Sequence, residues 1–207
     1  MSINSYFCVK KETENEMIIE RSRFISYVKP CRTEEEARAF IEEKRKAHPF
    51  ATHNCYAYIV EGGSVARFSD DGEPQGTAGQ PILEVIKNKK LCDSAVVVTR
   101  YFGGIKLGAG GLVRAYSQGA KEVIDKAGTV ENVLSSVYFI EMNYDLYSVF
   151  LKISDKTKCS VISTDFEDLV KIKVAVPISD DNFPLEILDK TNGKVEPKKI
   201  GEDFIVY

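Results

Sequence analysis

The residues best suited to bind a ligand stand in the segment VVVTRYFGGIKLGAGGLVRAYS, residues 96–117. Between an apolar stretch and an amphipathic one it carries five glycines: Gly103, Gly104, Gly108, Gly110 and Gly111. A glycine-rich loop lets a ligand approach the backbone closely, and the start of the following helix offers free amide protons to an anion. The segment therefore predicts one of two structures: an anion-binding loop, or a tight strand-to-helix turn in which the glycines only permit the backbone conformation.

Three basic residues accompany these glycines: Arg100, Lys106 and Arg114. They add positive charge where an anion would bind. The segment matches neither G-x-x-x-x-G-K-[ST] nor G-x-G-x-x-G, so neither familiar route to nucleotide binding is indicated. A hydrolase acting on a phosphate ligand at the Gly103–Gly111 loop stays open as an alternative.

A second group of polar residues lies in RFSDDGEPQGTAGQP, residues 67–81, where Asp70, Asp71 and Glu73 fall within four positions. Carboxylate oxygens at such spacing can bind a hard cation such as magnesium. Aspartates beside glycine and proline are also typical of an exposed turn, because their side chains hydrogen-bond the nearby backbone. We favour the turn, since no further ligand set is recognisable, and keep the metal site as the weaker alternative.

His53 and Cys55 suggest a nucleophile, because an adjacent imidazole can activate a thiol. On a strand these two side chains share one face, but the pattern offers no third triad member and no oxyanion site. With His48 the chain has only two histidines, which leaves little material for a histidine-rich metal site. A packed cysteine and a polar histidine are favoured, and we predict no catalytic residue.

The segment RSRFISYVK, residues 21–29, alternates as a strand. One face holds Arg21, Arg23, Ile25, Tyr27 and Lys29, and the core face holds Phe24 and Val28. A basic face with an aromatic ring can pair with phosphates and stack on a base. An ordinary solvated face is the alternative. Combined with the glycine-rich segment, the predicted surface for nucleic acid or a partner is Arg21, Arg23, Tyr27, Arg100, Tyr101, Lys106 and Arg114.

The composition of the 207 residues limits the possible surroundings and partners. Five cysteines, odd in number and never in a C-x-x-C pair, favour a reducing cytoplasm over a disulfide framework. No signal segment and no long apolar stretch is recognisable, so we expect neither export nor membrane binding. The net charge is −3, with 19 Lys and Arg against 18 Asp and Glu up to Ser135, and 9 against 13 after it. A basic patch is therefore expected in the first part.

The elements that position these residues predict an α+β protein of two domains, residues 1–133 and 136–207. In the first, three strands precede a helix whose start is marked by a capping box of Thr33 and Glu36. A hairpin around Gly62 and Gly63, a helix from Pro81 to about Lys89, the buried strand SAVVVTRYF and a helix ending before Gly128 follow. The second domain reads βαββαβ, the order of a ferredoxin-like sandwich.

Four segments resemble the signature blocks of the YigZ/Impact family: RSRFISYVKP, ATHNCYAY, RFSDDGEPQGTAGQPILEV and VVVTRYFGGIKLGAGGLVRAYS. They cover most of residues 20–120, and the last 70 residues resemble the second domain of bacterial members. The resemblance implies a first domain similar to domain IV of elongation factor G, with a left-handed βαβ fold, and a second similar to its domain V. No catalytic residues are agreed for bacterial members, so none is carried over.

Eukaryotic Impact regulates translation initiation, and the resemblance therefore implies a translation-related role. The RWD domain that precedes the Impact domain in eukaryotes is not expected here, so their partner is not transferred. Our main hypothesis is a translation-associated protein that binds RNA, the ribosome or a ribosome-bound partner without catalysis and without a cofactor. The alternatives are the phosphate-ligand or metal-dependent hydrolase and a protein-interaction module that does not bind nucleic acid.

Overall fold

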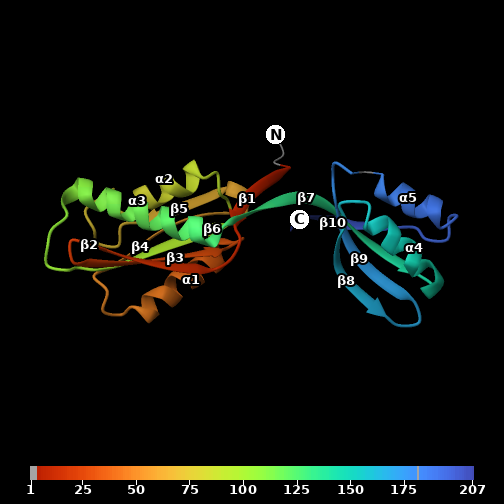
Figure 1. The fold of residues 1–207 in the computed structure, drawn as a ribbon, viewed down its shortest axis with the longest axis horizontal. Coiled ribbons are helices and arrows are strands. Elements are labelled where there is room, and N and C mark those ends of the chain that lie inside the picture. Colours follow the sequence, from red (N-terminus) through yellow and green to blue (C-terminus); the bar gives the residue numbers. More distant parts are fainter. Residues whose placement is uncertain (1–3, 181) are drawn as a thin grey trace. The chain divides into compact units, whose positions relative to one another are not determined.

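The computed structural model describes residues 4–180 and 182–207 (Figure 1). The chain divides into two compact units, one of residues 6–130 and the other of residues 131–207 together with Asn4 and Ser5. Among the described helices, none combines the length and the apolar character needed to cross a lipid bilayer.

The sheet of the first unit has the strand order β2-β3-β6-β4-β5, with every neighbouring pair antiparallel. Its strands are β2 (Thr13–Ile19), β3 (Ser22–Pro30), β4 (His53–Val60), β5 (Val65–Ser69) and β6 (Ser94–Tyr101), and β1 (Ser5–Val9) precedes them. The central strand β6 is buried over all but its last residue, as its β-branched sequence predicts. A short helical turn, η1 (Glu61–Gly63), joins β4 to β5, and both its glycines have positive φ.

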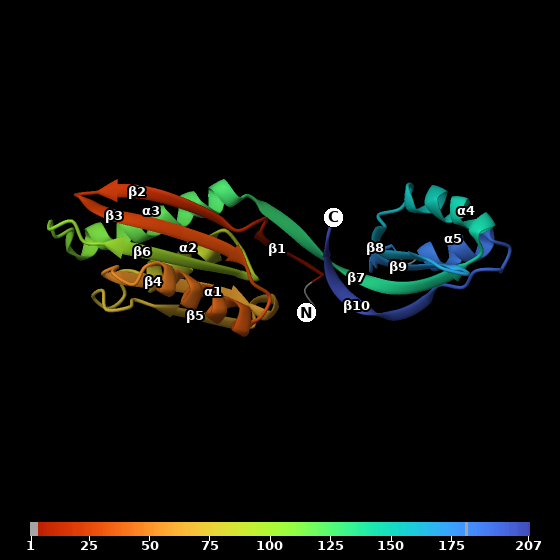
Figure 2. The same ribbon diagram turned by 90° about the horizontal axis from the view of Figure 1, so that it is seen from below.

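Helices cover both faces of this sheet (Figures 1 and 2). Helices α2 (Gly79–Asn88) and α3 (Gly108–Ala127) pack on one face, and α1 (Glu34–Ala47) packs on the other, each over its own apolar core. The predicted capping box is confirmed: Thr33 Oγ1 accepts the Glu36 amide at 3.2 Å, and the Glu36 carboxylate accepts the Arg32 amide at 2.7 Å. The start of α1 is therefore fixed by its own sequence.

The outer face of β3 differs from the predicted solvated, basic face. Ile25 and Tyr27 are buried there under α1, in the core that contains Phe40. Arg21 lies in the turn before β3, with a positive φ of 62°. Strand alternation correctly places Ile25 and Tyr27 on one side, but a helix covers that side, so the prediction of a basic solvated strand was wrong.

The second unit contains β7 (Thr129–Met142), α4 (Tyr144–Ser154), β8 (Ser160–Phe166), β9 (Val170–Pro177), α5 (Phe183–Lys190) and β10 (Lys198–Val206). Its strands pair antiparallel in the order β10-β7-β9-β8. The core between sheet and helices includes Phe150, Ile172 and Phe183. The predicted βαββαβ order and the α+β class are both confirmed.

Candidate functional site

The glycine-rich loop between β6 and α3 lies against the turn between β2 and β3. A Cβ atom placed on Gly103 would stand only 2.0 Å from the carbonyl carbon and oxygen of Arg21, so only glycine fits there. The Gly103 amide also donates to Ser22 Oγ at 3.2 Å. The loop and the start of β3 therefore lie at the same end of the first unit, as Figure 1 shows.

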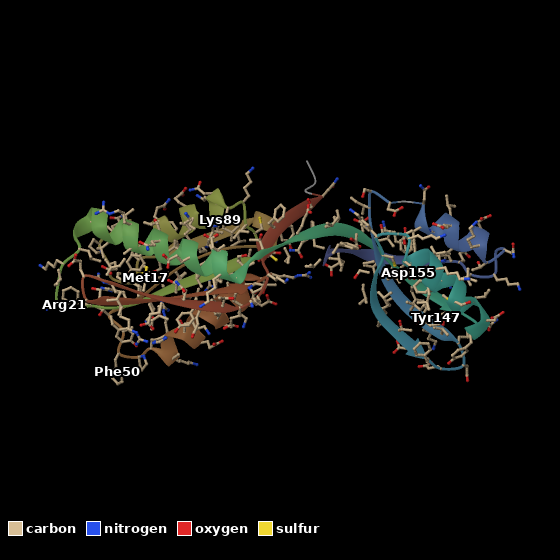
Figure 3. The ribbon with its side chains drawn as sticks, in the orientation of Figure 1. Met17, Arg21, Phe50, Lys89, Tyr147 and Asp155 are labelled. Carbon is tan, nitrogen blue, oxygen red and sulfur yellow. The ribbon has the colours of Figure 1, made fainter. Side chains whose placement is uncertain are left out.

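Three of the predicted basic residues are exposed at this end: Arg21, Lys106 and Arg114. Within the described part of the chain, none of the three takes part in an ion pair. Lys106 and Arg114 both line a groove of about 410 Å³ that Glu20 and Ile105 also line. We call Arg21, Lys106 and Arg114 the basic tip, and Figure 3 labels Arg21 at that end of the unit.

Arg23 is exposed as well, but its charge is already paired. Its guanidinium donates two hydrogen bonds of 2.8 Å to the carboxylate of Glu16 on the neighbouring strand. The guanidinium carbon lies 5.9 Å from the centre of the Tyr101 ring. Arg23 is therefore less available to a partner than the three residues of the basic tip.

Arg100 is not part of the predicted surface, because it is buried in an ion pair. Its Nη1 lies 2.6 Å from Glu73 Oε1, and the two side chains are 6% and 4% exposed. Its Nη2 donates to Ser22 Oγ at 3.2 Å, and the Tyr116 hydroxyl donates to the same Glu73 oxygen at 2.8 Å. Burial raises the pKa of Tyr116, which keeps this hydroxyl a donor. A surface role for Arg100 was therefore a wrong prediction.

Tyr27 and Tyr101 lie on the opposite face of the sheet from Arg100, beside α1. Their hydroxyls contact the two ring nitrogens of His48, Tyr27 at Nε2 (2.7 Å) and Tyr101 at Nδ1 (2.9 Å). Burial, followed by the charges of Arg23 and Lys44, lowers the pKa of His48. Tyr27 is only 8% exposed, so its ring cannot offer a stacking face to a base.

The three carboxylates of the acidic segment have different structural partners. Asp70 accepts the amides of Gly76, Ala78 and Gly79 and so holds the start of α2. Asp71 accepts the Asn54 amide at 2.6 Å and pairs with Arg45 at 3.2 Å. Glu73 faces Arg100. Over residues 4–180 and 182–207 the structure shows no cluster of three or more His, Cys, Asp or Glu able to hold a metal ion.

His53 and Cys55 do not form a nucleophile pair. Cys55 is fully buried, its thiol donates to the Asp70 carbonyl at 2.9 Å, and burial raises its pKa, which disfavours the reactive thiolate. His53 Nδ1 lies 2.8 Å from the Asp71 carbonyl oxygen, and its Nε2 lies 3.8 Å from Glu73 Oε2. His53 is thus directed toward Glu73, not toward Cys55.

A pocket of about 430 Å³ opens beside this histidine, between the end of β6 and the start of α3. Its polar lining comes from Thr52, His53, Glu73, Arg100 and Lys106, and its apolar lining includes Pro74, Phe102 and Leu107. We call it the His53 pocket. The sequence did not predict this pocket, because its lining residues come from four separate segments of the chain. One local feature pointed to it: Phe102, an aromatic residue next to the glycines, is 46% exposed.

Comparison with known proteins identifies the family. The model of the Impact N-terminal domain matches residues 20–124, about half of the chain. The chain belongs to the IMPACT family. It is 40% identical to the IMPACT family member YvyE of Bacillus subtilis over 199 residues, which cover 95% of this chain and 92% of the relative.

Two further IMPACT relatives show how far the similarity reaches. The IMPACT family member YigZ of Escherichia coli is 32% identical over 89% of this chain and 92% of its own length. Protein IMPACT of Oryctolagus cuniculus is 32% identical over 92 residues, which are 42% of this chain and 29% of that protein. A solved structure, described as the crystal structure of a hypothetical protein, matches with a TM-score of 0.66 at 30% identity, covering 98% of this chain and all of that one.

Proposed function

We propose that this IMPACT family member is a cytoplasmic, translation-associated protein whose first unit binds RNA or a ribosome-bound partner through the basic tip, without catalysis. The basic tip is the observation that carries the proposal. Arg21, Lys106 and Arg114 come from a strand turn, a loop and a helix, yet all three are exposed at one end and lack ion-pair partners in the described chain.

The charges around the tip support binding to phosphates. An exposed cation without a carboxylate partner keeps its full charge for phosphate oxygens, and such contacts supply most of the affinity of non-specific nucleic-acid binding. Glu20 is the acidic residue in the lining of the groove, so the local balance stays positive. The exposed ring of Phe102 next to Lys106 offers a face on which a base can stack.

The family relationship supports the link to translation, since the Impact family is associated with translational regulation. The free thiols of Cys31, Cys55, Cys92 and Cys159 support a reducing compartment. The basic tip lies in residues 20–124, the part that matches the Impact N-terminal domain. We therefore assign partner binding to the first unit.

Cosedimentation of the purified chain with ribosomes at increasing salt tests the proposal. The charge-reversal variant Arg21→Glu/Lys106→Glu/Arg114→Glu is expected to stay in the supernatant where the natural chain pellets. A matched control, Lys10→Glu/Lys11→Glu/Lys90→Glu, changes the net charge equally at three exposed lysines that lie away from the tip. The proposal fails if the natural chain does not pellet at low salt, or if both triple variants behave alike.

Pull-down of cellular partners with and without nuclease distinguishes RNA from protein. If RNA is the contact, nuclease releases the ribosomal material; if a ribosome-bound protein is the contact, the material stays bound. Loss of capture in the tip variant is expected in both cases, because the same cations make the contact.

A further inference from the structure

The His53 pocket has the size and lining of a site for a small molecule. Its volume of about 430 Å³ lies within the range of roughly 300–1,000 Å³ found for small-molecule sites. Such sites combine apolar walls with a few fixed polar groups. Here the apolar walls include Pro74, Phe102 and Leu107, and the fixed polar groups include the buried carboxylate of Glu73.

Two polar groups that line this pocket, the His53 ring and the Glu73 carboxylate, lie close together without a hydrogen bond between them. The carbonyl oxygen of Asp71 can only accept, so the contact of 2.8 Å requires the proton of His53 to stand on Nδ1. Nε2 of the neutral ring is then an acceptor, and it lies 3.8 Å from Glu73 Oε2, beyond hydrogen-bond distance. Arg100 and Tyr116 both bond the other oxygen, Oε1. Oε2 therefore receives no hydrogen bond from the described residues.

The second oxygen of Glu73 is open to the pocket. The Glu73 side chain is only 4% exposed, but Oε2 is not among the fully buried atoms that lack a hydrogen-bond partner, so a molecule in the pocket can reach it. The nearby Nε of Arg100, by contrast, is buried and has no hydrogen-bond partner in the described chain. A ligand group that donates to both Nε2 and Oε2 would satisfy the acceptor pair.

Another part of the pocket lining is suited to an anion. Gly108 and Ala109, the first two residues of α3, line it together with Lys106. The amides of a first helical turn have no partners within the helix, and the helix dipole makes this end positive. The residue before the helix, Leu107, provides no side-chain cap, and the first turn holds no acidic residue. The protein itself therefore places no anion at this helix start.

We propose that the His53 pocket binds a small phosphomonoester that also carries a hydroxyl or amino group, as a nucleoside monophosphate does. The phosphate lies at Lys106 and the first amides of α3. The donor group lies between His53 Nε2 and Glu73 Oε2, and an aromatic base packs on Phe102. Phosphate binding at a helix start follows from its geometry, and the two acceptors select ligands that can donate.

Isothermal titration calorimetry with the full chain tests this site, using AMP, ribose 5-phosphate, adenosine and inorganic phosphate as probes. AMP is expected to bind saturably and most tightly, ribose 5-phosphate more weakly, and adenosine and inorganic phosphate at least about tenfold more weakly than AMP, since each lacks one of the two recognised groups. Absence of binding by every phosphomonoester overturns the proposal.

Two variants locate the ligand. His53→Asn keeps a donor toward the Asp71 carbonyl but removes Nε2, and Lys106→Ala removes the cation; each is expected to weaken AMP binding about tenfold or more. Lys121→Ala, an exposed lysine later on α3, is the matched control and should bind as the natural chain does. Unchanged binding in either pocket variant overturns the proposal.

A measurement on the natural chain tests the site without depending on whether a variant folds. In a 15N-labelled sample, AMP should shift the amide signals of Gly108 and Ala109 and the ring signals of His53, while the signals of β9 in the second unit stay in place. Binding without those shifts overturns the proposal. The pocket shares Lys106 and Phe102 with the proposed ribosome contact, but the two proposals can fail separately. Arg114→Glu, outside this pocket, should weaken ribosome binding but leave AMP binding within about threefold at physiological salt.

Discussion

The replacement Glu73→Gln tests whether the Glu73–Arg100 pair is the buried charge pair that the structure shows. Glutamine has nearly the same size and keeps an oxygen that accepts hydrogen bonds, so the change removes mainly the negative charge. The guanidinium of Arg100, 6% exposed, then lies buried without a counter-charge. The experiment therefore measures the cost of an uncompensated charge rather than the cost of a cavity.

The expected loss follows from the burial of the two side chains. Breaking a buried ion pair by removing one partner costs about 3–5 kcal/mol, and the remaining amide oxygen places this variant near the lower end, about 3 kcal/mol. The control Arg23→Gln breaks the Arg23–Glu16 pair, whose side chains are 51% and 43% exposed. Exposed pairs contribute about 0–1 kcal/mol, so the control should change little.

Native-state hydrogen exchange at the amides of β6 is the suitable assay, because it reports the opening of the first unit separately from the second. A loss of about 3 kcal/mol speeds exchange more than about 100-fold, since each 1.4 kcal/mol corresponds to a factor of ten. In Glu73→Gln/Arg100→Met both charges are gone, so part of the protection should return. Exchange in Glu73→Gln no faster than in Arg23→Gln would refute the reasoning.

Three further changes test other parts of the fold. Gly103→Ala should lower the free energy of unfolding by about 1–3 kcal/mol or more in a melting experiment, because the added Cβ would lie 2.0 Å from backbone atoms. The control Gly110→Ala, whose added Cβ would have its nearest neighbour at 3.8 Å, should be neutral or slightly stabilising. Thr33→Ala removes the side-chain hydrogen bond that caps the first turn of α1 and should cost about 1 kcal/mol in urea unfolding. Thr157→Ala, which removes a hydroxyl that donates to the Ile153 carbonyl outside any helix start, is the comparison. Burial holds the pKa of His48 below its usual value of about 6.5, so the unfolded chain binds the proton more tightly than the folded chain does. The free energy of unfolding should therefore fall as the pH drops below about 6.5. An NMR titration of the His48 ring should show a midpoint below that of an unfolded peptide, and a midpoint above it would contradict the burial.

Local sequence patterns predicted the elements of the fold because each pattern acts over a few neighbouring residues. Thr33 and Glu36 are three residues apart and together cap α1. The continuous apolar sequence of β6 is by itself sufficient to predict a buried strand. The same holds for the hairpin turn at Gly62 and Gly63. Such signals are short-range, so one sequence is sufficient to show them.

The predicted site was less accurate because its residues meet only in the folded chain. Arg100 and Glu73 are 27 residues apart, and no spacing rule indicates that they form a buried pair. Alternation along β3 shows which side chains share a face but not that α1 covers that face, which is why Tyr27 was misplaced on the surface. Lys106 and Arg114 were predicted from their nearness to the glycines, and the structure places them on one groove.

The salt dependence of RNA binding tests the role of the basic tip most directly. The affinity of the natural chain for a single-stranded RNA is measured by fluorescence anisotropy at several salt concentrations, beside Arg21→Glu/Lys106→Glu/Arg114→Glu and the control Lys10→Glu/Lys11→Glu/Lys90→Glu. If the three tip residues contact phosphates, the slope of log affinity against log salt falls in magnitude by about two in the tip variant, and the control keeps the natural slope. Equal slopes in all three proteins would contradict RNA binding through the basic tip.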